Sequence, residues 1–235
     1  MTLHVEQFRY GHDNLGYLVF GRSEALAVDG GAWREILDFT DSRRLRLLYV
    51  THTHRHHDHL VGSEELLEQS GARLLGFQDL QDGSIIALDG EPVRVYRTPG
   101  HSIDSVCFHA GRYLLSGDTL FTGTIGNCFS GNLRAFHESI LRLMSLPGDT
   151  VVFPGHDYRA LAVAFARSLE PGNRDLDAYM DSHEPACVRS LLREELKVNP
   201  YLRFNDPGII GILKKRGLPV DTEWERWQSI MAIEE

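Results

Sequence analysis

Cysteine and basic side chains are scarce in this chain, and each scarcity excludes a class of protein. The 235 residues include three cysteines, Cys107, Cys128 and Cys187, too few and too widely spaced for a disulfide framework. None of them is part of a metal-binding or redox motif, so we expect buried, unpaired thiols in a reducing compartment. The 24 lysines and arginines are outnumbered by 33 aspartates and glutamates, and the net charge of −9 argues against a nucleic-acid partner.

Long apolar runs are also missing. No stretch approaches the roughly 18 apolar residues that a membrane-spanning helix needs, and the first residues, MTLHVEQ, lack the basic segment and apolar core of a signal peptide. We therefore expect a soluble, cytoplasmic protein without membrane contact. Hydrophobic residues make up 42% of the chain, which is enough for a sizeable core in one large domain or two unequal ones.

Short strands alternate with helices in the first two thirds of the chain, and the pattern becomes helical after residue 157. We predict strands at 15–20, 24–28, 45–50, 72–77 and 150–153, a strand-rich stretch at 84–115, and helices at 33–39, 60–69 and 133–144. His137, on the last of these helices, is expected to be a surface or packing residue. Further helices are predicted at 160–169 and 184–198, followed by short, irregular structure in which Trp224 and Trp227 pack back onto the body.

Histidine, in contrast, is concentrated in one segment, THTHRHHDH at residues 51–59. It follows the apolar run at 45–50 and precedes a helix with an acidic first turn. The histidines therefore lie on the loop that leaves the carboxyl end of a strand, where α/β proteins hold their sites. A purification tag or a loose metal scavenger would be terminal or uniform, whereas this segment is internal and includes Asp58.

The spacing within this loop predicts a metal site. Alternate residues of an extended segment point the same way, so His54 and His56 can bind one ion. Asp58 and His59 follow after the chain has begun to turn, and they can face a second position nearby. Imidazole and carboxylate ligands suit zinc, manganese or iron.

Four segments resemble, in their order along the chain, the ligand motifs of the metallo-β-lactamase superfamily. They are HTHRHHDH at 52–59, TPGH at 98–101, LSGDTLF at 115–121 and VVFPGHDY at 151–158. Each motif is weak alone, because a histidine after Pro-Gly or an aspartate after glycine is common in turns. Four of them in the right order are specific.

Other segments resemble one branch of that superfamily, glyoxalase II, the hydroxyacylglutathione hydrolases. They are DN at 13–14, DTLF at 118–121, EPGN at 170–173 and NPYLR at 199–203. The resemblance implies an α/β fold, the αββα metallo-β-lactamase sandwich, in a catalytic domain at residues 1–157. It also implies a smaller helical domain, at residues 158–235, that covers the substrate.

The same resemblance implies two divalent metal ions, most simply zinc, with iron or manganese as alternatives. The first ion would bind His54, His56 and His101, the second Asp58, His59 and His156, and Asp118 would bridge them. A hydroxide shared by the two ions would cleave a thioester, with Asp58 as the catalytic residue that orients it. His52 and His57 fall outside the pattern, so we expect a structural His52 and an exposed or supporting His57.

The substrate side departs from the family pattern. Glyoxalase II enzymes carry a lysine and, two residues later, a tyrosine that hold glutathione, and this chain has Asn127 and Phe129 there. Tyr158 does match a tyrosine that contacts glutathione, but the carboxyl end lacks the family's basic pair. We predict a hydroxyacylglutathione hydrolase, or a close homologue with altered thiol recognition, acting on a small-molecule thioester.

Three alternatives remain open from the sequence. A persulfide dioxygenase would bind one iron through His54, His101 and Asp118. Those enzymes carry a segment similar to RGCGRT after the aspartate, and residues 122–129 of this chain do not match it. A metal-dependent lactonase or esterase would use the same metal site on another ester. A non-catalytic metal-binding protein should have lost ligands, and here they are all present.

Overall fold

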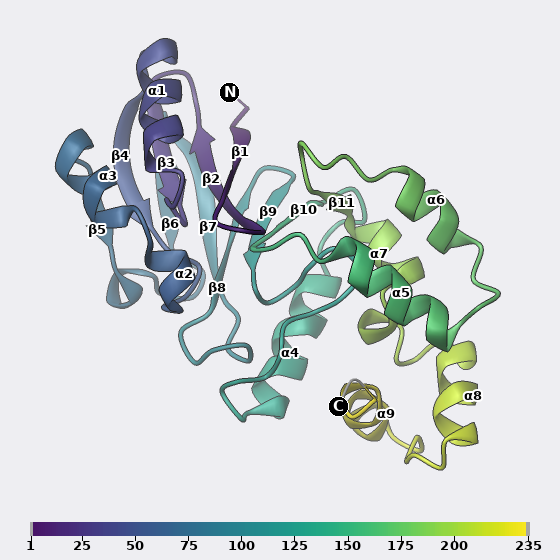
Figure 1. The fold of residues 1–235 in the computed structure, drawn as a ribbon. Helices are drawn as coiled ribbons and strands as arrows, with labels where there is room; N and C mark the ends of the chain where they lie inside the picture. Colours follow the sequence, from purple (N-terminus) through teal and green to yellow (C-terminus); the bar gives the residue numbers. More distant parts are fainter. Residues whose placement is uncertain (1, 234–235) are drawn as a thin grey trace.

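Two β-sheets packed face to face form the centre of the molecule, which the computed structural model describes from residue 2 to residue 233 (Figure 1). The first sheet contains, in spatial order, β1 (His4–Tyr10), β2 (Asn14–Phe20), β3 (Glu24–Val28), β4 (Arg46–Thr51) and β5 (Arg73–Leu75). The second contains β11 (Ser190–Leu191), β10 (Val151–Pro154), β9 (Tyr113–Gly117), β8 (Val106–Ala110), β7 (Glu91–Arg97) and β6 (Ile85–Leu88). The pairs β3–β4, β4–β5 and β9–β10 are parallel.

Strand β2 shows why the first sheet needs cover on both faces. All of its residues are buried, and successive side chains of a strand point to opposite faces. Tyr17 and Val19 belong to the hydrophobic cluster between the sheets. Leu18 and Phe20 belong to the cluster on the outer face.

Helices form the two outer layers. α1 (Trp33–Arg43) and α3 (Ser63–Ser70) cover the first sheet, where Ile36 and Leu66 are fully buried. The second sheet is covered by α4 (Leu133–Met144), α7 (Leu192–Val198), α8 (Pro207–Lys215) and α9 (Glu223–Met231). These helices share one hydrophobic cluster with the outer face of β9 and β10. The expected αββα sandwich is therefore confirmed.

The predicted helix at 60–69 begins later, as α3 at Ser63, and a separate short helix, α2 (His57–Leu60), precedes it. The break falls at Gly62, whose φ of +76° lies in the left-handed region. A Cβ atom at this position would lie 2.8 Å from the carbonyl oxygen of Gly30, so a larger residue would push the two loops apart. The break holds the short helix α2, with Asp58 and His59, close to the end of β3.

The carboxyl-terminal part is more helical than the sequence predicts, and Figure 1 shows its green and yellow helices gathered on one side of the sheets. The expected helix at 160–169 is α5 (Arg159–Leu169), and α6 (Asp175–Asp181) follows it without having been predicted. None of the helices in the described range is long and apolar enough to cross a membrane.

Two predictions in this part are wrong. The helix predicted at 184–198 begins only at Leu192, because Ser190 and Leu191 pair with β10 as strand β11. The irregular structure predicted after it is helical, since the side chains of Asp206 and Thr222 cap α8 and α9. The prediction that Trp227 packs back onto the body is confirmed, because its side chain is fully buried.

Three strands end at the same edge of the sandwich. β4 ends at Thr51, β9 at Gly117 and β10 at Pro154, and a predicted ligand motif continues beyond each end. The backbone N–H of Gly155 donates to the carbonyl oxygen of Gly117 at 2.9 Å, which joins the last two ends. The fold thus brings distant parts of the chain together at this edge.

Candidate metal centre

Three imidazoles and a carboxylate converge in a first cluster at this edge. Nδ1 of His56 lies 2.9 Å from Nε2 of His54 and 3.0 Å from Nε2 of His101. Oδ2 of Asp118 lies 3.5 Å from Nε2 of His101 and 3.9 Å from Nε2 of His54. One ligand atom of each residue therefore faces a common point.

A second cluster lies on the other side of Asp118. Nε2 of His156 is 3.3 Å from Nε2 of His59 and 3.3 Å from Oδ2 of Asp58. Asp118 reaches this cluster as well, since its Oδ1 is 3.3 Å from Nε2 of His59 and its Oδ2 is 3.5 Å from Nε2 of His156. The two clusters together contain all seven predicted ligands.

Hydrogen bonds on the outer side of the imidazole rings decide which ring nitrogen carries a proton and which one can bind a metal. Nδ1 of His59 lies 2.9 Å from Oδ2 of Asp29, and Nδ1 of His156 lies 3.0 Å from Oδ1 of Asp13. Nδ1 of His101 lies 3.0 Å from the carbonyl oxygen of Asn127. Because these oxygens can only accept, each Nδ1 carries a proton, and each Nε2 is the nitrogen that is left to bind a cation in its cluster.

Asp29 also orients His54, through Thr53. Its carboxylate accepts from the backbone N–H and the hydroxyl of Thr53, both at 2.8 Å. The hydroxyl proton is used in that bond, so the Thr53 oxygen accepts from Nδ1 of His54 at 3.1 Å. One buried carboxylate therefore orients a ligand in each cluster.

This arrangement fits divalent cations. The facing ring nitrogens lie 2.9–3.3 Å apart, close to the separation of about 3.3 Å between ligands that bind a tetrahedral zinc at about 2.0–2.1 Å. Among the described residues, no hydrogen-bond partner serves the buried Oδ1 of Asp118. A cation in each cluster would bind these nitrogens and satisfy that oxygen.

The charges of the site match this conclusion. Burial lowers the pKa of His54 to about 4, which keeps the ring neutral and able to bind a metal. Burial also opposes charge on His59, but the carboxylates of Asp29 and Asp118 raise its pKa well above the ordinary value. The second cluster therefore attracts positive charge, and a divalent cation would replace a proton there.

A cavity of about 390 Å³ opens onto both clusters. It brings the three residues predicted to contact the substrate, Asn127, Phe129 and Tyr158, together with the ligands His56, Asp58, His101, Asp118 and His156. Phe121, Ile125 and Leu161 complete an apolar wall. A substrate in this cavity would contact both clusters.

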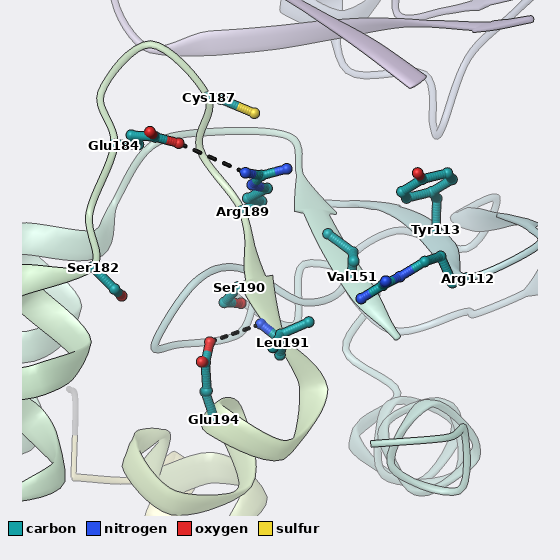
Figure 2. A pocket seen from close by; sticks show the side chains of 10 residues that line it. All are labelled: Arg112, Tyr113, Val151, Ser182, Glu184, Cys187, Arg189, Ser190, Leu191 and Glu194. Atoms are coloured by element: carbon teal, nitrogen blue, oxygen red, sulfur yellow. Dashed lines mark hydrogen bonds and ion pairs between the residues drawn. The ribbon is translucent and has the colours of Figure 1, made fainter. Parts of the chain in front are cut away.

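A cavity of similar volume, about 350 Å³, has no histidine among its described lining residues (Figure 2). Its charged side chains balance one another. A guanidinium nitrogen of Arg189 lies 3.7 Å from Glu184, and the backbone N–H of Leu191 donates to Glu194 at 3.0 Å. None of the predicted site residues lines this cavity. Converging imidazoles and carboxylates thus distinguish the candidate metal centre from this polar cavity.

Comparison with known proteins agrees with this geometry. Residues 75–156 match the family model of the metallo-beta-lactamase superfamily, and residues 157–230 match the model of the hydroxyacylglutathione hydrolase C-terminus. A hydroxyacylglutathione hydrolase from Chromohalobacter salexigens is 31% identical over 83% of this chain and 83% of its own. One from Methylococcus capsulatus is 33% identical over 92% of this chain and 93% of its own.

The chain belongs to the hydroxyacylglutathione hydrolase family. Solved structures share its fold. ETHE1 from Myxococcus xanthus has a TM-score of 0.71 at 22% identity, covering 100% of this chain and 92% of its own. TTHA1623 in a di-iron-bound form has a TM-score of 0.61 at 23% identity, covering 84% of this chain and 100% of its own. Family membership confirms the prediction of a metal-dependent hydrolase.

Two glycines of this family member have no room for a side chain. A Cβ atom at Gly155 would lie 2.2 Å from Oδ1 of Asp118, and one at Gly126 would lie 1.9 Å from the backbone oxygen of Asp118. Both glycines therefore allow the chain to approach the shared carboxylate closely. This explains why a glycine precedes His156 and why residues 125–127 can pass over His101.

The residues outside the ligand pattern behave largely as expected. His57 is exposed, whereas Nε2 of His52 lies 2.7 Å from the hydroxyl of Ser63. His137 is buried and contacts the rings of Trp224 and Trp227, so it is a packing residue. The thiols are unpaired, but only Cys107 is buried, while Cys128 and Cys187 are half-exposed.

Sequence reasoning missed the residues that orient the ligands. Asp29 and Thr53 were not singled out, and Asp13 and Asn14 were noted only as part of a resemblance. Nδ2 of Asn14 donates to Oδ2 of Asp58 at 2.8 Å. The sequence does contain a feature that points to Asp29. This carboxylate directly follows the buried strand β3, which pairs with the strand that leads to the histidines.

Proposed function

We propose that this chain hydrolyses a small-molecule thioester, a hydroxyacylglutathione or a close analogue, with two divalent cations that are most simply zinc. The first cation would be held by His54, His56 and His101, the second by Asp58, His59 and His156, and Asp118 would be shared. The observation that carries the proposal is that two ligand clusters meet at one carboxylate and open into one cavity. When bound, such a pair lowers the pKa of a water and polarises the substrate carbonyl.

Asp58 is the residue that we assign to orienting the attacking water. Its side chain is 46% exposed toward the cavity, unlike the buried ligands around it. Burial opposes its charge, but the hydrogen bond from Asn14 keeps the pKa of Asp58 below its usual range. It is therefore an ionised acceptor that can hold a proton of the water in place.

Tyr158 is placed to contact the substrate. Its ring stacks on His156 with 5.0 Å between the centroids and an interplanar angle of 4°. Burial raises the pKa of Tyr158 to about 12, so the phenol stays protonated and can donate a hydrogen bond. The thiolate that leaves on cleavage is a weak base, so it needs little help from an acid in the protein.

The second cluster is the reason to prefer a binuclear hydrolase over a dioxygenase. A single iron held by His54, His101 and Asp118 would leave Nε2 of His59 and Nε2 of His156, which face each other at 3.3 Å, without a cation to bind. The survival of all seven ligands in one place also favours catalysis over a scaffold role.

We further propose the division into a catalytic domain at 1–157 and a helical, substrate-covering domain at 158–235. In support, Leu161 and Ala162 of α5 line the same cavity as the ligands. We also propose a cytoplasmic location, which the unpaired cysteines favour.

The test is metal analysis of the purified protein coupled to a panel of thioesters with one acyl group. We expect two divalent cations per chain and thioester hydrolysis that a chelator abolishes and zinc restores. One tightly bound iron with oxygen consumption on a persulfide would support the dioxygenase instead. Hydrolysis of lactones but not of thioesters would support the esterase alternative.

A further inference from the structure

A second cavity of about 610 Å³ adjoins the metal cavity, and Asn127 and Phe129 line both. We call it the α9 cavity, because Gln228, Met231 and Ala232 at the end of the chain's last helix form part of its wall. Its other lining residues are Cys128, Gly131 and Leu133, before and at the start of α4. A molecule whose reacting carbonyl lies at the metal centre could therefore extend toward α9.

The described lining of the α9 cavity carries no charged side chain. Among the described residues that line it, none is a lysine, arginine, aspartate or glutamate, and its longest polar side chains are the neutral amides of Asn127 and Gln228. The arginines closest to it along the chain are engaged elsewhere. Arg134 lies 3.9 Å from the ring centre of Trp224, and Arg226 donates to Asn205 at 2.8 Å.

Exposed apolar side chains line the metal cavity, and one of them also lines the α9 cavity. Phe129 is 67% exposed and lines both cavities, and Leu161 is 74% exposed and lines the metal cavity. The ring of Phe129 lies against His101, with 5.3 Å between the centroids, so its free face is directed at the cavity rather than at the core. Such grouped apolar surface is typical of a binding site.

We infer that the α9 cavity holds the thiol part of the substrate and that this part is an uncharged, amide-bearing arm of the pantetheine or N-acetylcysteamine type. The inference rests on the proposed thioester hydrolysis at the metal centre. Asn127 and Gln228 can exchange hydrogen bonds with amides, while Phe129 and Met231 can pack against methylene groups. A glutathione carboxylate would lose its water without gaining a cation, which should weaken its binding roughly ten- to a hundredfold.

The first experiment measures binding without turnover. Calorimetric titration of the metal-loaded protein would use thioethers that cannot be hydrolysed: S-butylglutathione, S-butyl-N-acetylcysteamine and S-butylpantetheine. We expect the two neutral thioethers to bind at least about tenfold more tightly than S-butylglutathione. Equal or tighter binding of S-butylglutathione, or no binding of any of the three, would overturn the inference.

The second experiment moves a charge into the cavity. We expect Asn127→Lys to strengthen S-butylglutathione binding about tenfold and not to strengthen the binding of the neutral thioethers, which gain no charge pair and lose the Asn127 amide. The side chain of Asn127 is exposed, and only its backbone oxygen contacts His101, so the variant should fold. Gln69→Lys, on the exposed face of α3, makes the same charge change away from both cavities. This control should not change the affinity for S-butylglutathione relative to that for the neutral thioethers. An equal gain in the two variants would also overturn the inference.

Hydrolysis assays separate this inference from the proposed function. If lactoylglutathione is the best substrate and Asn127→Lys does not improve it, the neutral-arm assignment is wrong and thioester hydrolysis stands. If no thioester is cleaved while the neutral thioethers still bind more tightly, hydrolysis is wrong and the cavity's preference for neutral arms stands.

Discussion

The metal centre and the α9 cavity adjoin each other, yet they are built from opposite kinds of residue. At the metal centre, imidazoles and carboxylates converge, and partners such as Asp29 and Asp13 fix the direction of the rings. The α9 cavity is lined by neutral amides and apolar side chains. The difference separates two tasks. Ligands must match the geometry of a cation, whereas the wall beyond them decides which thiol is accepted.

The largest effect should follow from removing the carboxylate that the two clusters share. We expect Asp118→Ala to lower kcat/KM by orders of magnitude, because both clusters would lose the carboxylate that we propose they share. Steady-state kinetics and metal content would measure this, and circular dichroism would check the fold. A variant that keeps two cations and near-normal activity would show that the clusters act separately.

The next effect concerns the orientation of the ligands rather than the ligands themselves. Asp29→Asn keeps the size of a fully buried side chain but weakens the acceptor for His59 and Thr53. We expect metal affinity to fall about 10- to 100-fold, measured by competition with a chelator. Asp38→Asn, on the exposed face of α1, is the matched control. Unchanged affinity in Asp29→Asn would mean that packing alone holds the rings in place.

The residues predicted to contact the substrate should respond differently, because Asn127 and Phe129 are not metal ligands. The double change Asn127→Lys with Phe129→Tyr restores the pair that the family resemblance implies for glutathione. We expect the KM for lactoylglutathione to fall roughly ten- to a hundredfold, with a much smaller change in kcat. A wild-type protein that already saturates at low micromolar lactoylglutathione, and gains nothing from the double change, would place glutathione recognition elsewhere in the chain.

The smallest effect is expected within the histidine loop. His57 is exposed and its neighbour His56 faces the first cluster, so the two positions test the register of the loop directly. His57→Ala should change kcat/KM by no more than about twofold, as is usual for surface positions. His56→Ala should be nearly inactive in the same assay. Equal losses in the two variants would show that the ligands were assigned in the wrong register.

Unbroken apolar runs predicted the core strands, whereas the αββα sandwich itself was predicted from the family resemblance of the ligand motifs. Strand β2 and the helix α4 were placed within a residue of their bounds, since their patterns are strong and local. Helices α8 and α9 were missed because their stability depends on packing against the second sheet, which a local pattern does not contain. The short strand β11 was predicted as helix for the same reason, because its pairing with β10 is a long-range contact.

The ligands could be predicted because they occur in motifs, whereas their partners could not. Asp29 acts through Thr53 and His59, which lie more than twenty residues away, and only the folded chain brings them together. The lack of basic side chains in the described lining of the α9 cavity could be predicted in part, because Asn127 and Phe129 stand where the family has a lysine and a tyrosine. That Gln228 and Met231 complete the same wall became clear only from the position of α9.

The central claim is that one carboxylate joins two metal sites, and anomalous diffraction from zinc-loaded crystals tests it most directly. We predict two peaks about 3.5–4 Å apart. One should lie among His54, His56 and His101, the other among Asp58, His59 and His156, with Asp118 between them. A single peak in the first cluster, at full zinc loading and with the second cluster empty, would contradict the account.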